Sequence, residues 1–179
     1  MKGKRTAELK SKRIALFPGA FNPLHDGHRR MREHAEAFLQ QRVCYEISIE
    51  NVDKPSLDAA EIERRIEQFG NVPCWITRAP TFLEKARLFA PAVFVVGADT
   101  VRRISSPKYY GGNSHRLQAA IAEINSLACR FLVFGREIDG AFHALPRMEI
   151  ADAIREICDC VPESLFRHDI SSTQLRENQ

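Results

Sequence analysis

Five short apolar runs alternate along this chain with longer stretches in which apolar residues recur at helical spacing. The runs lie at residues 14–17, 43–49, 74–77, 93–96 and 131–134. They are bounded by glycine, proline or polar residues, and the most continuous of them predict strands buried on both faces. The connecting stretches are long enough for the helical crossovers that parallel strands need. The sequence therefore predicts an α/β fold, a doubly wound parallel sheet of about five strands in a three-layer sandwich.

The helix-period stretches predict helices over residues 26–40, around 62–69, and over 82–89, 114–127 and 148–158. Thr81 and Glu84 have the spacing of a capping box, so Thr81 is expected to cap the third of these helices. Between the fourth strand and residue 114 we expect a polar loop. Trp75 is expected in the core, and Cys158 and Cys160 are expected to be two thiols at a helix end.

Net positive charge is concentrated at the N-terminus. The first thirteen residues carry six basic side chains and one acid, and the remainder carries 20 basic and 22 acidic residues. We therefore expect a basic N-terminal arm at residues 1–12, followed by one domain at 13–179. The slightly acidic body does not indicate a nucleic-acid-binding face. An adaptor that binds nucleic acid through the arm alone is the weaker alternative.

The composition limits the class of protein further. With 44% hydrophobic residues the chain can bury a core, which excludes disordered and collagen-like classes. No run of eighteen apolar residues occurs, so no membrane span is expected. The five cysteines have no paired CxxC spacing and indicate a reducing, cytoplasmic setting.

The loop after the first strand is the most informative stretch, because ligands of such sheets bind at the carboxyl ends of the strands. Gly19 permits a tight turn there, and His25 and His28 flank Gly27 where a helix is predicted to begin. Backbone N–H groups at a helix start attract phosphate, and two imidazoles one turn apart would add donors. These residues fit an anion site and a purely structural turn equally well. A metal site would need more ligands than the two histidines.

A second polar cluster lies near the C-terminus. Ser171 and Gln174 have capping-box spacing, which an ordinary helix start would also show. Ser171, Ser172 and Thr173 offer hydroxyl and backbone donors, and Arg176 offers a guanidinium fork. These groups suit a triphosphate tail.

Four segments together resemble a known family. Residues 19–28, Gly-Ala-Phe-Asn-Pro-Leu-His-Asp-Gly-His, resemble its GxFxPxHxGH signature, and residues 170–176 resemble its ISSTxxR motif. Residues 51–55 fall where the family carries a phosphate-binding lysine, and residues 94–99 resemble its FxxGxD segment. Over residues 13–178 the chain is thus similar to the HIGH-motif nucleotidyltransferase superfamily, the cytidylyltransferase-like proteins. Within it, the chain is most similar to the nicotinamide and nicotinate mononucleotide adenylyltransferases.

The resemblance implies a Rossmann-like fold and the transfer of a nucleoside monophosphate, AMP from ATP, to a phosphorylated acceptor with release of pyrophosphate. It implies that His25 and His28 stabilise the reacting phosphorus and that Lys54 and Arg176 neutralise phosphate charge. It implies no protein metal site, with Mg²⁺ bound mainly through substrate phosphates. The residues it implies at the nucleotide are Gly19, Ala20, Phe21, Asn22, Gly27, Gly97, Asp99, Arg136, Ser171, Ser172 and Thr173.

Several alternatives stay open on the sequence. Lys54 also fits a solvated surface lysine, Asp99 a helix cap, and Arg136 a residue without ligand contact. Where the adenylyltransferase branch often carries a tryptophan-bearing segment, this chain has Tyr109 and Tyr110. The acceptor is therefore open between nicotinamide mononucleotide, nicotinate mononucleotide, phosphopantetheine and, with CTP, a small phosphorylated alcohol. A catalytically idle nucleotide-binding protein and a homo-oligomer also stay open.

Overall fold

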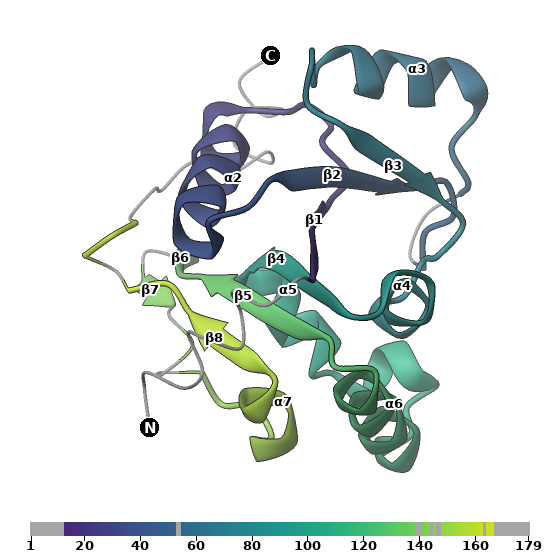
Figure 1. The fold of residues 1–179 in the computed structure, drawn as a ribbon. Coiled ribbons are helices and arrows are strands. Elements are labelled where there is room, and N and C mark those ends of the chain that lie inside the picture. The colour runs from purple at the N-terminus through teal and green to yellow at the C-terminus, as the bar shows by residue number, and fades with distance from the viewer. Residues whose placement is uncertain are drawn as a thin grey trace.

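The computed structural model describes residues 13–52, 55–138, 141–143, 145, 148–162 and 164–166 (Figure 1). The strands are β1 (Ile14–Pro18), β2 (Val43–Ser48), β3 (Cys74–Thr77), β4 (Ala92–Gly97), β5 (Arg130–Phe134), β6 (Arg136–Ile138), β7 (Ala141–His143) and β8 (Cys158–Cys160). The helices are α2 (Asp26–Leu39), α3 (Ala59–Glu67), α4 (Phe82–Phe89), α5 (Ala98–Ile104), the 3-10 helix η1 (Pro107–Tyr110), α6 (Ser114–Ser126) and α7 (Asp152–Glu156). The predicted arm at residues 1–12 lies outside the described residues.

The main sheet has six strands in the order β3-β2-β1-β4-β5-β8, and every neighbouring pair is parallel. In the centre, Leu16 of β1 is in register with Cys44 of β2 on one side and Phe94 of β4 on the other. The predicted α/β fold with a doubly wound parallel sheet is confirmed, with six strands where about five were expected. A separate two-stranded antiparallel pair, β6 and β7, follows β5.

The sixth strand corrects an expectation about two cysteines. Cys158 and Cys160 do not lie at a helix end: they belong to β8, which pairs with β5, and helix α7 ends before them at Glu156. This strand is three residues long and has Asp159 at its centre, so it lacks the apolar run that marked the other strands. Asp159 is accommodated because Arg130 of β5 donates to it at 2.8 Å from Nε.

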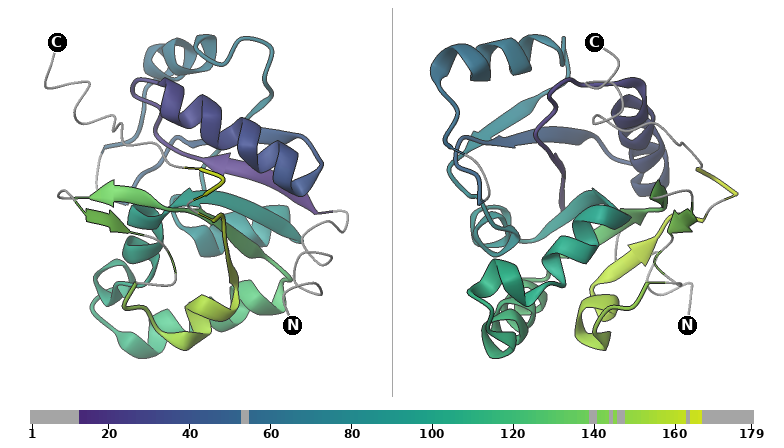
Figure 2. Two further views of the ribbon diagram at one scale, coloured as in Figure 1. Left: turned by 90° about the vertical axis from the view of Figure 1, so that its left-hand side faces the viewer. Right: turned by 180° about the vertical axis from the view of Figure 1, so that it is seen from behind.

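Alternation along the strands divides the core between the two faces of the sheet. On one face, Leu16, Phe94 and Phe131 pack against α4, α5 and α6. On the other face, side chains such as Phe17 and Val95 pack with α2. Figure 2 shows α2 on one side of the sheet and α6 with α7 on the other. The expected three-layer arrangement is therefore present.

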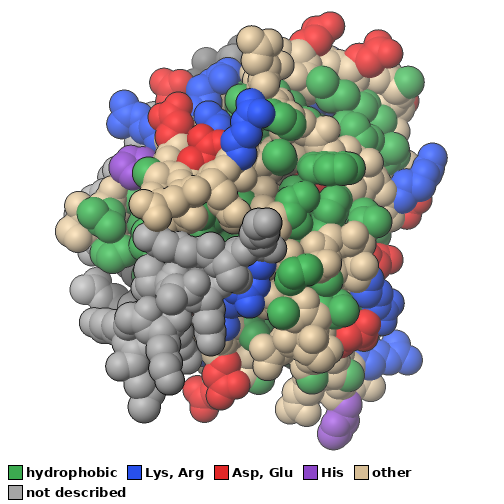
Figure 3. Space-filling model, in the orientation of Figure 1, with side chains coloured by type: hydrophobic (Ala, Val, Ile, Leu, Met, Phe, Trp, Pro, Cys, Tyr) green, Lys and Arg blue, Asp and Glu red, His purple; other side chains and the backbone are tan. Residues whose placement is uncertain are grey.

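Two further expectations were wrong. The stretch after β4 is not only a polar loop, because it forms α5 and the 3-10 helix η1. Trp75 is not a core residue: it lies on the edge strand β3 and is 47% exposed. Figure 3 shows apolar side chains gathered on this face, in the region where Figure 1 draws β3 and α4. Edge strands have a neighbour on one side only, so their outward side chains lack the cover that central strands receive.

The strand order creates a crevice at the centre of the sheet. β1 and β4 are neighbours, but the loop after β1 leads to α2 on one face and the loop after β4 leads to α5 on the other. Open parallel sheets bind ligands outside the carboxyl ends of the strands at such a switch point. The loop with the two histidines begins there. Within the described residues, no helix has the length and apolar character that a bilayer crossing requires.

Candidate active site

The loop after β1 is shaped by one glycine and one aromatic ring. A Cβ atom on Gly19 would lie 2.6 Å from Cζ of Phe21, so only glycine leaves room for the ring to fold beneath the loop. Phe21 has a left-handed φ of 45° and is 2% exposed. Its ring contacts Tyr45 and Phe69 edge-on, with centroids 4.9 and 5.2 Å away. The side chain of Phe21 is thus a core anchor, and this residue faces the loop surface only through its backbone.

The two histidines lie together at the start of α2. His25 occupies the N-cap position with an extended backbone, and its ring stacks on that of His28 with centroids 3.7 Å apart and planes 27° apart. The His25 backbone N–H donates to Nδ1 of His28 at 3.4 Å. In a neutral imidazole whose Nδ1 accepts, the proton sits on Nε2. With Nδ1 of His28 accepting this bond, Nε2 is the ring nitrogen left to act as a donor.

Side chains of helix α3 and of Gln68, which follows it, hold this loop through hydrogen bonds. Arg65 donates to the carbonyl oxygen of Ala20, and Arg64 donates to Oδ1 of Asn22, each at 2.8 Å. Gln68 accepts from the Leu24 N–H at 2.8 Å and donates to the Phe21 carbonyl at 3.2 Å. Sequence reasoning missed these supports, because contacts more than forty residues apart leave no local signal.

One glutamate organises the two arginines of α3. Glu61 accepts hydrogen bonds from Arg64 and Arg65, and these bonds lower the pKa of Glu61 to about 2. The arginine side chains are thereby held in the orientations that reach the loop. Arg65 is 7% exposed, so its charge is largely shielded from water, and the ion pair with Glu61 offsets part of the cost of burying it.

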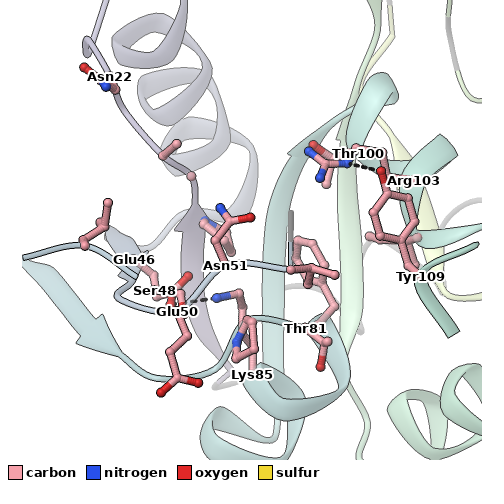
Figure 4. A pocket seen from close by; sticks show the side chains of 18 of the residues that line it. Asn22, Glu46, Ser48, Glu50, Asn51, Thr81, Lys85, Thr100, Arg103 and Tyr109 are labelled. Atoms are coloured by element: carbon pink, nitrogen blue, oxygen red, sulfur yellow. Dashed lines mark hydrogen bonds and ion pairs between the residues drawn. The ribbon is translucent and has the colours of Figure 1, made fainter. Parts of the chain in front are cut away.

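A cavity of about 440 Å³ opens beside the loop, on the face of the sheet covered by α4 and α5. Its size is within the usual range for small-molecule sites. The lining comes from β2, from the loops after β1 and β2, and from α3, α4, α5 and η1, and Figure 4 shows most of these side chains. The lining residues are Pro18, Gly19, Ala20, Asn22, Glu46, Ser48, Glu50, Asn51, Val52, Pro55, Leu57, Arg65, Pro80, Thr81, Phe82, Lys85, Thr100, Arg103, Ile104, Tyr109 and Tyr110.

The inner wall of the cavity carries a buried ion pair. Lys85 of α4 lies 2.8 Å from Glu46 of β2, and the two side chains are 6% and 1% exposed. Thr77 of β3 also donates to the same carboxylate oxygen at 2.6 Å. Burial lowers the pKa of Lys85, and the neighbouring Glu46 charge opposes this shift. The sequence did contain a signal for this site, because Glu46 interrupts an apolar strand that is buried on both sides.

The two tyrosines noted in the sequence both line the cavity. Nε of Arg103 donates to the Tyr109 hydroxyl at 3.2 Å, and the guanidinium lies 5.1 Å from the centroid of the Tyr109 ring. Burial raises the pKa of Tyr110. Thr81 forms the capping box with Glu84 that was expected, which fixes the start of α4 at the cavity. Phe82 of that first turn also reaches the lining.

Gly97 and Asp99, from the segment that resembles the family's FxxGxD motif, lie at the start of α5. Gly97 is the N-cap, and a Cβ atom there would lie 2.5 Å from Oδ1 of Asp99. The Asp99 carboxylate therefore occupies the space above Gly97 at the carboxyl end of β4. Thr100, the next residue, lines the cavity, and so do Arg103 and Ile104 one turn further along α5.

Of the predicted site residues, the structure places Gly19, Ala20 and Asn22 on the cavity and His25, Gly27 and His28 at the adjoining helix start. Arg136 begins β6, directly after the turn that follows β5, and its side chain lies outside the described part. The predicted residues Lys54, Ser171, Ser172, Thr173 and Arg176 lie outside the described residues, and their roles stay predictions. In the described ranges, no three His, Cys, Asp or Glu side chains group as a metal site would require.

Comparison with known proteins agrees with this arrangement. Residues 16–178 match the family described as cytidylyltransferase-like. No curated protein matches the chain significantly. The matched region contains both histidines and the whole cavity lining. It also contains all the strands, except for the first two residues of β1. The chain therefore belongs to the cytidylyltransferase-like family of the HIGH-motif nucleotidyltransferase superfamily, a membership that supports a nucleotidyltransferase activity.

Proposed function

We propose that this protein transfers AMP from ATP to a phosphorylated acceptor, nicotinamide mononucleotide or nicotinate mononucleotide, and releases pyrophosphate. The observation that carries the proposal is the stacked pair of His25 and His28 at the start of α2, which shares one loop with the 440 Å³ cavity. A helix N-terminus with two imidazoles suits a phosphate chain. The adjoining cavity has room for a second, smaller molecule.

In the proposed reaction, a phosphate oxygen of the acceptor forms a bond to the α-phosphorus of ATP. The bond from that phosphorus to the bridging oxygen of the β-phosphate breaks, and pyrophosphate leaves with the electron pair. The attacking phosphate is already an anion, so catalysis depends on positioning and charge stabilisation more than on a general base. No covalent enzyme intermediate is needed.

The histidines would act on charge that develops at the reacting phosphorus. The Nε2 N–H of His28, set by the bond from the His25 N–H to Nδ1, would donate to a non-bridging oxygen. We place Lys54 and Arg176 at the phosphates as neutralising cations, and Ser171, Ser172 and Thr173 as donors to the triphosphate. Gly97 and Asp99, at the carboxyl end of β4, would border the nucleotide.

Mg²⁺ would supply further neutralisation of the triphosphate. Mg²⁺ commonly keeps much of its water and takes substrate phosphates as ligands. The helix start and the two imidazoles at α2 suit the phosphates that would hold such an ion. The protein's own share is then to hold the phosphates in line through α2 and its loop.

The test is a pyrophosphate-release assay that crosses ATP and CTP with nicotinamide mononucleotide, nicotinate mononucleotide, phosphopantetheine and glycerol 3-phosphate. Release with ATP and a pyridine mononucleotide is expected. Release only with CTP, or only with another acceptor, would contradict the proposed substrates and keep the family activity. No release from folded protein that binds ATP would contradict catalysis and favour an idle nucleotide-binding protein.

A further inference from the structure

The buried ion pair at the cavity has one oxygen that no other group engages. Both donors that reach Glu46, Nζ of Lys85 and Oγ1 of Thr77, bond to Oε1. Across the residues that the structure describes, nothing donates to Oε2 of Glu46, which is shielded from solvent. A buried charged oxygen without a donor is costly, and such groups in folded proteins call for a partner. Glu46 lines the cavity, so the missing donor can be supplied from there.

Lys85 complements this oxygen with a hydrogen-bond donor. Its ammonium group has three N–H bonds, and two of them go to Glu46 Oε1 at 2.8 Å and to the Ala79 carbonyl at 2.6 Å. Lys85 also lines the cavity, so its third N–H is available to donate to a molecule bound there. The negative charge of Glu46 favours the protonated form of Lys85 against the effect of burial on its pKa.

Ser48 extends the polar strip along β2. It lies two residues after Glu46, on the same face of the strand, and it also lines the cavity. Its hydroxyl oxygen is buried and, in the described part of the chain, has no hydrogen-bond partner. The inner wall thus presents a carboxylate oxygen, an ammonium N–H and a hydroxyl within one small region, as Figure 4 shows for Glu46, Ser48 and Lys85.

We propose that Glu46 and Lys85 select an acceptor whose head group is an uncharged carboxamide and reject one that carries a carboxylate. The inference rests on the proposed function, in which this cavity holds the acceptor. A carboxamide offers an NH₂ donor for Glu46 Oε2 and a carbonyl oxygen for Lys85. A carboxylate has no hydrogen for Oε2 and would place a second negative charge beside it, which is unfavourable in a buried site.

The first measurement uses the unaltered protein. Calorimetry gives the dissociation constants of nicotinamide mononucleotide and nicotinate mononucleotide, and pyrophosphate release gives kcat/KM for both with ATP. We expect the carboxamide to be preferred by about 10- to 100-fold, the range that one hydrogen bond to a charged group supplies. Equal or stronger binding of the carboxylate would overturn the inference, whatever the turnover.

The variant Glu46→Gln tests the residue itself. Its side chain keeps an oxygen for Thr77 and Lys85 but presents an NH₂ donor where Oε2 was, so the preference for the carboxamide is expected to disappear or reverse. If the variant does not fold, the double variant Glu46→Gln with Lys85→Met removes both buried charges and is measured in its place. An unchanged ratio in a folded variant would overturn the assignment to Glu46.

The matched control is Glu50→Gln, which removes the same charge at the rim of the cavity. The Glu50 side chain is 43% exposed and pairs with Arg78 at 3.3 Å. Water screens it, so we expect the substrate ratio to change by about fivefold or less. A shift as large as that of Glu46→Gln would mean that total charge, not the buried oxygen, sets the preference.

The two proposals fail in different ways. If a carboxamide preference in binding is seen without pyrophosphate release, the inference on selectivity stands and the proposed transfer fails. If pyrophosphate is released with no preference, the transfer stands and the selectivity fails. If neither mononucleotide binds the folded protein, the inference is overturned.

Discussion

Arg65 of α3 donates from Nη1 to the carbonyl oxygen of Ala20 at 2.8 Å. A helix inserted between β2 and β3 thus fixes the backbone of the loop that follows β1 and leads to the two histidines. The same guanidinium is tied to Glu61 through Nε and Nη2. The loop is therefore held by an already oriented side chain, which is the condition for precise placement of groups at its far end.

Replacing Arg65 is expected to damage both stability and turnover. Arg65→Met leaves the Ala20 carbonyl without its donor and leaves Glu61 with Arg64 alone, and it should lower the free energy of unfolding by about 1.5–3 kcal/mol. A displaced loop should also lower kcat by about 10- to 100-fold. Urea unfolding and pyrophosphate release measure the two effects.

The control for this change is Arg87→Met. Arg87 is exposed and pairs across the surface with Glu123, so we expect a stability loss of less than about 1 kcal/mol and no change in turnover. If Arg65→Met loses stability but keeps normal turnover, α3 supports the fold without positioning the loop.

His28→Ala is expected to remain folded and to lose about 100- to 1,000-fold in kcat, the loss typical of one stabilising donor at a reacting centre. The ring contributes packing against Phe21 at 5.1 Å, so a modest decrease in melting temperature should accompany the change. His28→Gln should recover part of the activity, since its amide N–H can reach toward the position of Nε2. His115→Ala, at the exposed start of α6, is the matched control and should keep full turnover. Normal turnover of folded His28→Ala would contradict the proposed mechanism.

The strands that are buried on both faces could be predicted from the sequence. β1, β4 and β5 were predicted to within one or two residues, because a parallel strand covered on both faces must be apolar throughout. The edge strand β3 was also predicted, from its short apolar run, although Trp75 and Ile76 are exposed. The short strand β8 was not readable, since Asp159 is tolerated there only through its bond to Arg130, 29 residues away. Local pattern carries no information on such a partner.

In the candidate site too, local features could be predicted from the sequence and long-range contacts could not. The helix start at His25 and Asp26 could be predicted from the sequence and is confirmed, whereas the role of His25 and His28 at a phosphate stays a prediction. The braces from α3 and the pairing of Glu46 with Lys85 depend on contacts 39 to 47 residues apart. They follow from the order of the strands, which periodicity alone does not give.

Gly19→Ala should destabilise the loop through a steric clash. The new Cβ would lie 2.6 Å from the ring of Phe21, which cannot withdraw because Phe17, Tyr45 and Phe69 surround it. We expect a loss of about 1–3 kcal/mol, as for other overpacked positions, with reduced turnover. Adding Phe21→Leu should recover part of the stability.

A control for this prediction is Gly70→Ala. Gly70 has a positive φ of 56°, but a Cβ atom added there would meet no other atom within 4 Å. Only backbone strain of about 1 kcal/mol is therefore expected, without an effect on turnover. If Gly19→Ala is as stable as the unaltered protein, the close approach of Phe21 to the loop is not what requires glycine.

Glu61 should make the stability of the protein depend on pH in the acidic range. Hydrogen bonds from Arg64 and Arg65 lower its pKa in the folded state to about 2, whereas an unperturbed glutamate titrates near about 4.3. The stabilisation is therefore complete above about pH 4.3 and is lost as the pH falls toward 2. Melting temperatures of the protein and of Glu61→Gln should differ at pH 7 and converge as the pH approaches 2. Glu67→Gln, an exposed change on the same helix, should follow the unaltered protein throughout. A difference between Glu61→Gln and the unaltered protein that stays constant down to pH 2 would show that the carboxylate does not derive its stabilising effect from the two arginines.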